Sequence, residues 1–387
     1  MFTNYKRAVI LSSILLGSVS MTGCIDQDKS SPNQVYIYTN DGNCSTTEET
    51  TSTPTPVEIT LPATVELQKE TLSGDITSDM KLTADKIWIL DGLVVVKDGA
   101  KLTIEAGTTI AGRDGTGATT SYMIVDKGSK IRAIGTSAKP IIFTSEKSID
   151  GATPGVGQWG GLVIIGKAGN EQVKAYEVNS EFEASSDDME DDSGILQHVK
   201  ILNSGITMEQ DKEINGLSLI GVGSDTIIED ITVDLSDDDG IEIWGGTVNL
   251  KNITVTNCTD DYFDIDDGYT GTVRNLNITV TGGNAGIEMS GTTHATFDGF
   301  NITLTDSKKE GGIYFKKDGI GGHFKNGRVI NNVTNGAGAI HSKGEADTDN
   351  ISFENVTLAG SSTDAKFIGD SAEAIEAVFD GGSGNSR

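Results

Sequence analysis

The sequence predicts an all-β protein, a single parallel β-helix of roughly ten coils. Three observations support this prediction. A six-residue apolar pattern returns every 22 to 29 residues, and a second short strand pattern advances in phase with it. The chain also has 48 glycines, only 6 prolines and 36% hydrophobic residues, a composition that excludes collagen and a wholly disordered chain.

The N-terminal segment predicts that the protein is exported from the cytoplasm. Residues 1–23 combine a short basic start, an apolar run and small residues directly before Cys24. This order resembles a bacterial lipoprotein signal, and the resemblance implies cleavage before Cys24 and lipidation of its thiol. An ordinary secretory signal is the alternative. The first acidic residue after the cysteine is Asp26, which favours the outer membrane or the cell surface. Residues 24–64 are rich in Ser, Thr and Pro, and they predict a flexible tether.

The β-helix is expected over residues 65–380, where the first pattern reads apolar–x–(Asn/Asp/Gly)–apolar–x–apolar. Its third positions are residues 230, 252, 275, 299, 326 and 355. A sharp corner between strands favours residues that tolerate left-handed backbone, and stacked Asn amides can also bond along the axis. We therefore interpret these residues as structural corners. Corner chemistry also explains three apparent glycosylation sequons without any modification: Asn252-Ile253-Thr254, Asn277-Ile278-Thr279 and Asn301-Ile302-Thr303.

The second pattern is a short alternating strand. Its middle residues are Glu242, Asp264, Glu288, Tyr314 and His341. Alternation places one side chain in the core and the next outside it, so these five residues are expected to point outward, one per coil. A leucine-rich repeat or a β-propeller would need other periods and other residues. Residues 381–387 are predicted to be a disordered tail, and Cys44 and Cys258 are interpreted as two unpaired thiols, although an exported protein could pair them.

The N-terminal half contains similar short apolar strands, but at less regular intervals. Segments 88–108, 127–135 and 158–166 alternate apolar strands with Gly-containing turns. From about residue 72 to residue 358 the chain resembles a widespread family of bacterial surface or secreted proteins with a right-handed, pectate-lyase-like parallel β-helix. The resemblance implies the fold but no single activity, because related β-helices include polysaccharide lyases, glycosidases and adhesins.

Acidic residues gather around the second pattern. Neighbouring strands lie about 4.8 Å apart, and two full charges at that distance repel by about 3 kcal/mol at an effective dielectric of 20. Such a concentration needs solvent, raised pKa values or a cation, and oxygen-rich surroundings suit Ca²⁺. A solvated acidic face is the alternative. The candidate metal ligands are Asp238, Asp239, Glu242, Asp260, Asp261, Asp264, Asp266, Asp267 and Glu288.

Aromatic and basic residues along the same row suggest ligand binding or catalysis. A sugar-binding surface is expected from Trp244, Tyr314, Lys316 and His341, although Trp244 could instead pack locally. An enzyme of this fold would use Ca²⁺ with a basic residue, or a carboxylate pair, to cleave a polysaccharide. The residues available for it are Glu242, Asp264, Glu288, Lys316 and Arg328, with Lys317 as a further base.

The sequence therefore predicts a lipid-anchored envelope protein that acts as a binding or adhesive platform, with Ca²⁺ as cofactor. Its expected partners are the membrane, through Cys24, and an extracellular polysaccharide or another surface protein. A nucleic-acid partner is excluded by the formal net charge of −28, from 57 acidic and 29 basic residues. A calcium-assisted polysaccharide lyase or hydrolase and a purely structural envelope component are the alternatives.

Overall fold

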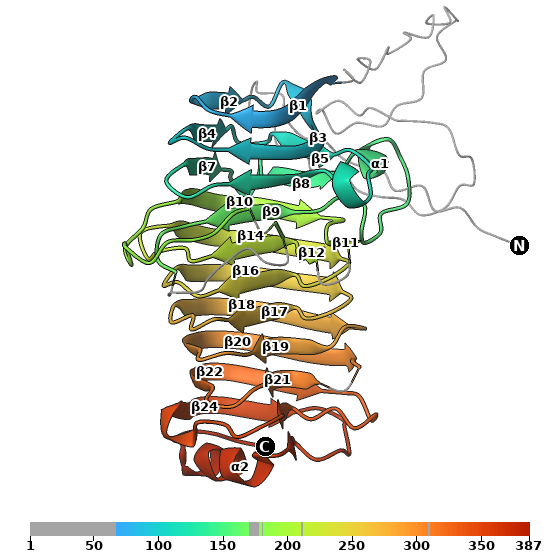
Figure 1. The fold of residues 1–387 in the computed structure, drawn as a ribbon. Coiled ribbons are helices and arrows are strands. Elements are labelled where there is room, and N and C mark those ends of the chain that lie inside the picture. Colours follow the sequence, from blue (N-terminus) through green and yellow to red (C-terminus); the bar gives the residue numbers. More distant parts are fainter. Residues whose placement is uncertain (1–66, 170–177, 180, 210–211, 309) are drawn as a thin grey trace, which may run out of the picture. The chain divides into compact units, whose positions relative to one another are not determined.

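The computed structural model describes residues 67–169, 178–179, 181–209, 212–308 and 310–387. They form a right-handed parallel β-helix, as predicted, with the coils stacked in chain order from β1 to α2 (Figure 1). The proposed signal, tether, Cys24 and Cys44 lie outside the described residues. In the described ranges, no helix has the length and apolar character needed to cross a membrane.

Each coil contributes to three parallel sheets. In the C-terminal half, a long strand bends at a corner, so that its two halves belong to sheets one and two, and a short strand follows in sheet three. The long strands are β10 (Gly194–Leu202), β14 (Ile227–Ser236), β16 (Asn249–Cys258), β18 (Thr272–Thr281), β20 (His294–Asp306), β22 (Gly321–Asn331) and β24 (Ile351–Ala359). The short strands are β13 (Leu217–Ile220), β15 (Ile241–Trp244), β17 (Phe263–Asp266), β19 (Ala285–Met289), β21 (Gly311–Phe315), β23 (Ile340–Ser342) and β25 (Phe367–Gly369).

The N-terminal coils continue the same sheets with less regular strands. Sheet one continues through β2 (Met80–Leu82), β4 (Lys101–Ile104) and β7 (Lys130–Ile134). Sheet two continues through the first parts of β1 (Gln68–Ile76) and β3 (Lys86–Val96), then β5 (Thr109–Gly112) and β8 (Ile141–Ser145). Sheet three takes the ends of β1 and β3, then β6 (Tyr122–Val125) and β9 (Leu162–Ile165). The remaining elements are the antiparallel pair β11 (Ile206–Glu209) and β12 (Lys212–Ile214), and the helices α1 (Glu146–Ile149), α2 (Ala372–Gly381), η1 (Gly117–Thr119) and η2 (Thr348–Asn350).

The corner between sheets one and two confirms the role predicted for the Asn/Asp/Gly position. Asp230, Asn252 and Asn275 have φ values of 57°, 57° and 56°, in the left-handed region. Their side chains also bond from coil to coil: Asn252 donates to Asp230 at 2.9 Å and Asn275 donates to Asn252 at 2.9 Å. Corner geometry does not explain Asn277 and Asn301, however, because both lie after the corner on the outer face of sheet two.

Two apolar clusters hold the coils together. The larger one fills the interior of the helix with inward-facing residues such as Ile241, Ile243 and Phe263. The smaller one lies on the outer face of sheet three in the N-terminal half, where Ile206 and Ile214 of the β11–β12 pair cover the strands. Part of the outer face is therefore also a packed surface.

The C-terminal end is ordered, which corrects the prediction of a disordered tail at residues 381–387. Helix α2 covers the last coil and buries Ile375 and Phe379. After the helix, the Ser386 amide donates to the Val356 carbonyl at 2.9 Å, and the Leu358 amide donates to the Ser386 carbonyl at 2.8 Å. The tail thus pairs with β24 and closes the last coil, because unpaired backbone groups at a sheet end are costly.

Candidate metal centre

The predicted row of acidic side chains lies on sheet three, in register. Glu242 of β15 aligns with Asp264 of β17, and Asp264 aligns with Glu288 of β19. These residues point away from the core, because their neighbours in the strand face inward. The row continues through Tyr314 and His341, as the period of the sequence predicted.

The burial of this row differs from the prediction. Glu242, Asp264 and Glu288 are only 5%, 7% and 1% exposed, whereas a row on an open sheet face would be solvated. The side chains around them provide the cover. Asn215 donates a short hydrogen bond to Glu242, and Lys316 forms a close ion pair with Glu288. Because water is largely excluded, the repulsion between the carboxylates is stronger than it would be on an open surface.

Turn residues that precede the strands add a second row of acids. The carboxylate of Asp239 accepts a hydrogen bond from the Asp261 amide at 2.7 Å, and that of Asp261 accepts one from the Ala285 amide at 2.5 Å. Asn215 holds the equivalent place one coil earlier, where its side-chain oxygen accepts from the Asp239 amide at 3.2 Å. This pattern fixes each turn against the next and directs the acidic side chains towards sheet three.

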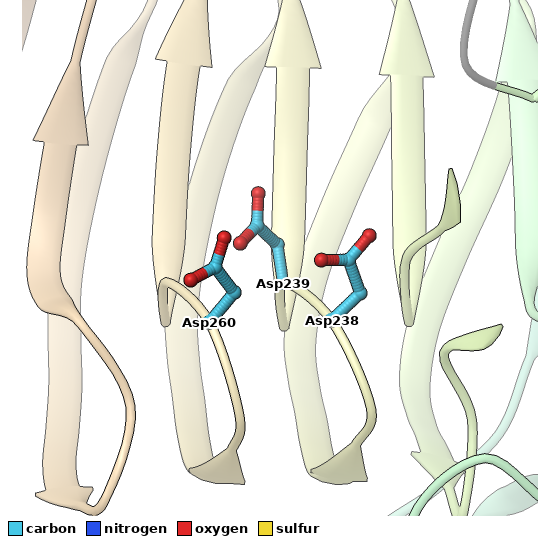
Figure 2. A group of neighbouring side chains, drawn as sticks. All are labelled: Asp238, Asp239 and Asp260. Carbon is cyan, nitrogen blue, oxygen red and sulfur yellow. The ribbon is translucent and has the colours of Figure 1, made fainter. Parts of the chain in front are cut away.

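The two rows form three overlapping groups in which the ligand atoms all lie within 4.8 Å of one another. Figure 2 shows one group, with Asp239 between Asp238 and Asp260 at the turns before the strands. The other two groups share Asp264. Carboxylate oxygens at such spacing are the ligands that Ca²⁺ prefers. Seven of the predicted ligands take part: Asp238, Asp239, Glu242, Asp260, Asp261, Asp264 and Glu288.

The electrostatics of the turn acids favour a bound proton or a cation. Burial, followed by the charges of Glu242 and Asp261, raises the pKa of Asp239 well above its ordinary value. Burial, followed by the charges of Glu288 and Asp264, does the same to the pKa of Asp261. The hydrogen bonds that these carboxylates accept from backbone amides favour the charged form, but they do not outweigh desolvation and like charge.

A lysine and a further acid, Lys316 and Glu310, lie near Glu288 at the C-terminal side of the groups. Burial lowers the pKa of Lys316, but the charges of Glu288, Asp264 and Asp261 outweigh it, so the net pKa is raised and the ammonium stays charged. Burial, followed by Glu288, raises the pKa of Glu310. Lys316 therefore compensates part of the negative charge at Glu288.

Two of the predicted metal ligands lie apart from the groups. Asp266 and Asp267 stand at the other end of β17, and Asp266 lies 3.8 Å from the ammonium of Lys317. Neither Asp266 nor Asp267 belongs to any of the three groups whose ligand atoms lie within 4.8 Å of one another. The sequence could not separate these acids, because all of them occur in one short run.

The predicted sugar-binding surface is only partly exposed, because Lys316 is exposed and His341 is partly exposed, but the two larger aromatic side chains are buried. For Trp244 the alternative of local packing holds. Trp244 is 7% exposed and belongs to the smaller apolar cluster. Tyr314 is 3% exposed, and its ring lies against that of His341, with a centroid distance of 4.8 Å. Rings held in this way offer no open face for a pyranose.

The predicted catalytic set is also divided between two sheets. Lys316 lies beside Glu288, as an enzyme would need, but Arg328 lies on β22 in sheet two. There its guanidinium donates to Asn301 at 2.7 Å. Arg328 therefore cannot act with the carboxylates of sheet three.

Two residues of the site were missed by the sequence analysis. Asn215 stands two residues before its strand, as Asp239 and Asp261 do, and Asn215-Gly216-Leu217 repeats the form of Asp239-Gly240-Ile241. Aligning the turns together with the strands would have found it. Glu310 stands three residues before Ile313, at the position that Asp238 and Asp260 hold in earlier coils, so the same alignment of the turns would also have found it.

Comparison with known proteins supports the fold. A family model described as a pectate-lyase-like β-helix domain matches residues 74–386. No curated protein and no solved structure matches the chain.

Proposed function

This chain belongs to the pectate-lyase-like β-helix family, and we propose that it is a lipid-anchored binding platform of the cell envelope that uses Ca²⁺ as a structural cofactor. Family membership supports the scaffold only, since one fold carries many functions. Support for Ca²⁺ binding comes instead from the carboxylates of the site.

The observation that carries the proposal is the overlap of the three carboxylate groups. Seven acids form three groups of three, with the ligand atoms of each group within 4.8 Å of one another and one acid shared between successive groups. Asp239, Asp261 and Glu288 are only 6%, 2% and 1% exposed. Buried acids in contact must take up protons or be neutralised by cations. At neutral pH a divalent cation does this without protonation, and it accepts several carboxylates at once. Ca²⁺ suits these ligands better than Zn²⁺, because the groups contain oxygen ligands only.

The test is a calorimetric titration of CaCl₂ into the metal-free protein. We expect saturable binding, and we expect Asp264→Asn to weaken it by about tenfold or more, because Asp264 belongs to two of the groups. Asp266→Asn is the matched control. It removes the same charge from the same strand, outside the groups, and should bind Ca²⁺ like the wild type.

Two results would contradict the cation role. One is the absence of saturable heat at millimolar Ca²⁺. The other is an equal loss of affinity in Asp264→Asn and Asp266→Asn, which would indicate a diffuse charge effect rather than a site.

The same variants separate a platform from an enzyme. A lyase or hydrolase must bring substrate to its carboxylates, yet Glu242, Asp264 and Glu288 are buried, and Arg328 lies on another sheet. These observations favour binding over catalysis. Cleavage of a polysaccharide that stops in Asp264→Asn would favour the enzyme instead.

Membrane attachment is a separate part of the proposal. It depends on the lipoprotein-like order of residues 1–23 and on Cys24, both outside the described residues. We expect the wild-type protein in the membrane fraction and the Cys24→Ala variant in the soluble or unprocessed fraction, because several acyl chains are needed for durable anchoring. Incorporation of a labelled fatty acid into Cys24→Ala at the wild-type level, or no incorporation into the wild type, would contradict lipidation.

A further inference from the structure

A polar groove lies away from the acidic groups, at the corner between sheets one and two. Its volume is about 320 Å³, and it crosses the coils that contain β10, β14, β16 and β18. The turn with Thr136, Ser137 and Pro140 forms one wall. Thr136 and Lys139 pair across this turn, with the Thr136 amide donating to the Lys139 carbonyl at 3.0 Å, so the wall has a defined shape.

Two aligned rows of polar residues form the floor. The first is the row of corner residues: His198, Asp230, Asn252 and Asn275. The hydrogen bonds between Asp230, Asn252 and Asn275 hold its side chains in fixed positions. His198 lies 3.6 Å from Asp230 at the first coil of the groove. This row is therefore ordered before any ligand arrives.

The second row lies beside the first, on the outer face of sheet two. The strand register aligns Lys200, Thr232, Thr254 and Asn277. Lys200 and Asn277 are exposed, and the two threonines are partly exposed. Within the described ranges of the chain, these four side chains make no hydrogen bond or ion pair with the protein, so their polar atoms face solvent and are available to a ligand.

The chemistry of the groove excludes several kinds of ligand. Backbone groups in a parallel sheet are paired with neighbouring strands, so a peptide cannot add to this face as a new strand. The net charge of −28 disfavours a polyanion. Locally, Lys200 and Asp230 balance each other, and the remaining lining offers mainly hydroxyl and amide groups. Such donors and acceptors, repeated about every 4.8 Å along the axis, suit a ligand with many hydroxyl groups and a repeating structure.

We propose that this groove binds a neutral glycan chain that runs along the helix axis, with Thr232, Thr254 and Asn277 bonding to its hydroxyls. The occupied length over four coils is about 14 Å, which is enough for a few sugar units. This inference rests on the proposed role as a binding platform, but not on the cation. Unlike the buried Trp244 and Tyr314, the side chains of this groove are accessible to a sugar.

The experiment is isothermal titration of the full chain with four neutral probes, cellohexaose, laminarihexaose, xylohexaose and mannohexaose, in the presence of EDTA. At least one probe should bind with micromolar to millimolar affinity. The triple variant Thr232→Val/Thr254→Val/Asn277→Ala should weaken that binding by about 30-fold. Thr303→Val is the matched control, since Thr303 lies on the same outer face outside the groove, and it should bind like the wild type.

The outcomes are distinguishable from those of the cation test. Thermal melting of the triple variant with and without Ca²⁺ checks its fold and its cation response on the same sample. The glycan proposal is overturned if no probe binds, if the folded triple variant binds as the wild type does, or if Thr303→Val weakens binding equally. Glycan binding without any Ca²⁺ response would overturn the cation role alone.

Discussion

Replacing Phe324 with alanine is expected to lower the free energy of unfolding by about 4 kcal/mol. The side chain is 1% exposed and lies at the centre of an aromatic column inside the helix. Its ring stacks on Phe297 with a centroid distance of 5.3 Å and on Phe353 at 5.2 Å. Removing it leaves a cavity in three consecutive coils and breaks both contacts, each worth about 0.5–1.5 kcal/mol beyond the buried area.

Chemical denaturation and hydrogen exchange measure this effect. In a stacked-repeat fold each coil contacts only its neighbours, so lost protection should concentrate in β20, β22 and β24. Phe324→Leu should cost less than Phe324→Ala, because most of the volume remains. His323→Ala, at an exposed position on the same strand, should change the stability by about 0.5 kcal/mol or less. A loss for His323→Ala as large as that for Phe324→Ala would show that the column does not stabilise these coils.

The repeat explains why so much of the fold could be predicted from the sequence. Stacking makes residues at equal phase neighbours in space, so the series 242, 264 and 288 gave the register of sheet three directly. The corner positions could be predicted equally well, because few residues tolerate a φ near 57°. The predictions that were confirmed all concern periodic features.

The features that could not be predicted are those that occur once. The β11–β12 pair, together with Val178 and Phe182, packs on the outer face near Trp244, and helix α2 covers the last coil. Such insertions have no counterpart in other coils, so no period reveals what they bury. For this reason the sequence left the packing of Trp244 open, and the disorder predicted for residues 381–387 was wrong. The burial of the acidic row has a related cause, since it depends on contacts with individual side chains such as Asn215 and Lys316.

Without divalent cations, the protein is expected to lose stability as the pH rises from about 4 towards neutrality. The pKa values of Asp239 and Asp261 are raised in the folded state, so the folded protein holds protons that the unfolded chain releases. The stabilisation from these protons is complete below the ordinary pKa of 3.8, and it is lost as the pH rises through the raised values. Each group contributes a slope of about 1.4 kcal/mol per pH unit at most, so both together reach about 3 kcal/mol per unit.

Other acids modify this slope without reversing it. Burial also raises the pKa values of Asp191, Asp237 and Glu310, which act in the same direction. The hydrogen bond from Asn326 lowers the pKa of Asp298, which acts in the opposite direction, but Asp298 lies where solvent screens its charge. The charged groups that face Asp239 and Asp261 determine the net sign, and these are Asp238, Glu242, Asp260, Asp264 and Glu288.

The measurement is a series of urea denaturations in EDTA between pH 4 and pH 8, repeated with Ca²⁺ at about 100 times its dissociation constant. Ca²⁺ should restore about 2.7 kcal/mol near neutral pH and little near pH 4, because protons then occupy the carboxylates. Asp239→Asn should reduce the slope in EDTA, since it removes one of the two titrating groups, whereas Asp266→Asn should leave the effect of Ca²⁺ unchanged. If stability in EDTA instead rises with pH, burial does not penalise the charged acids, and the physical reason for a cation at these turns is lost.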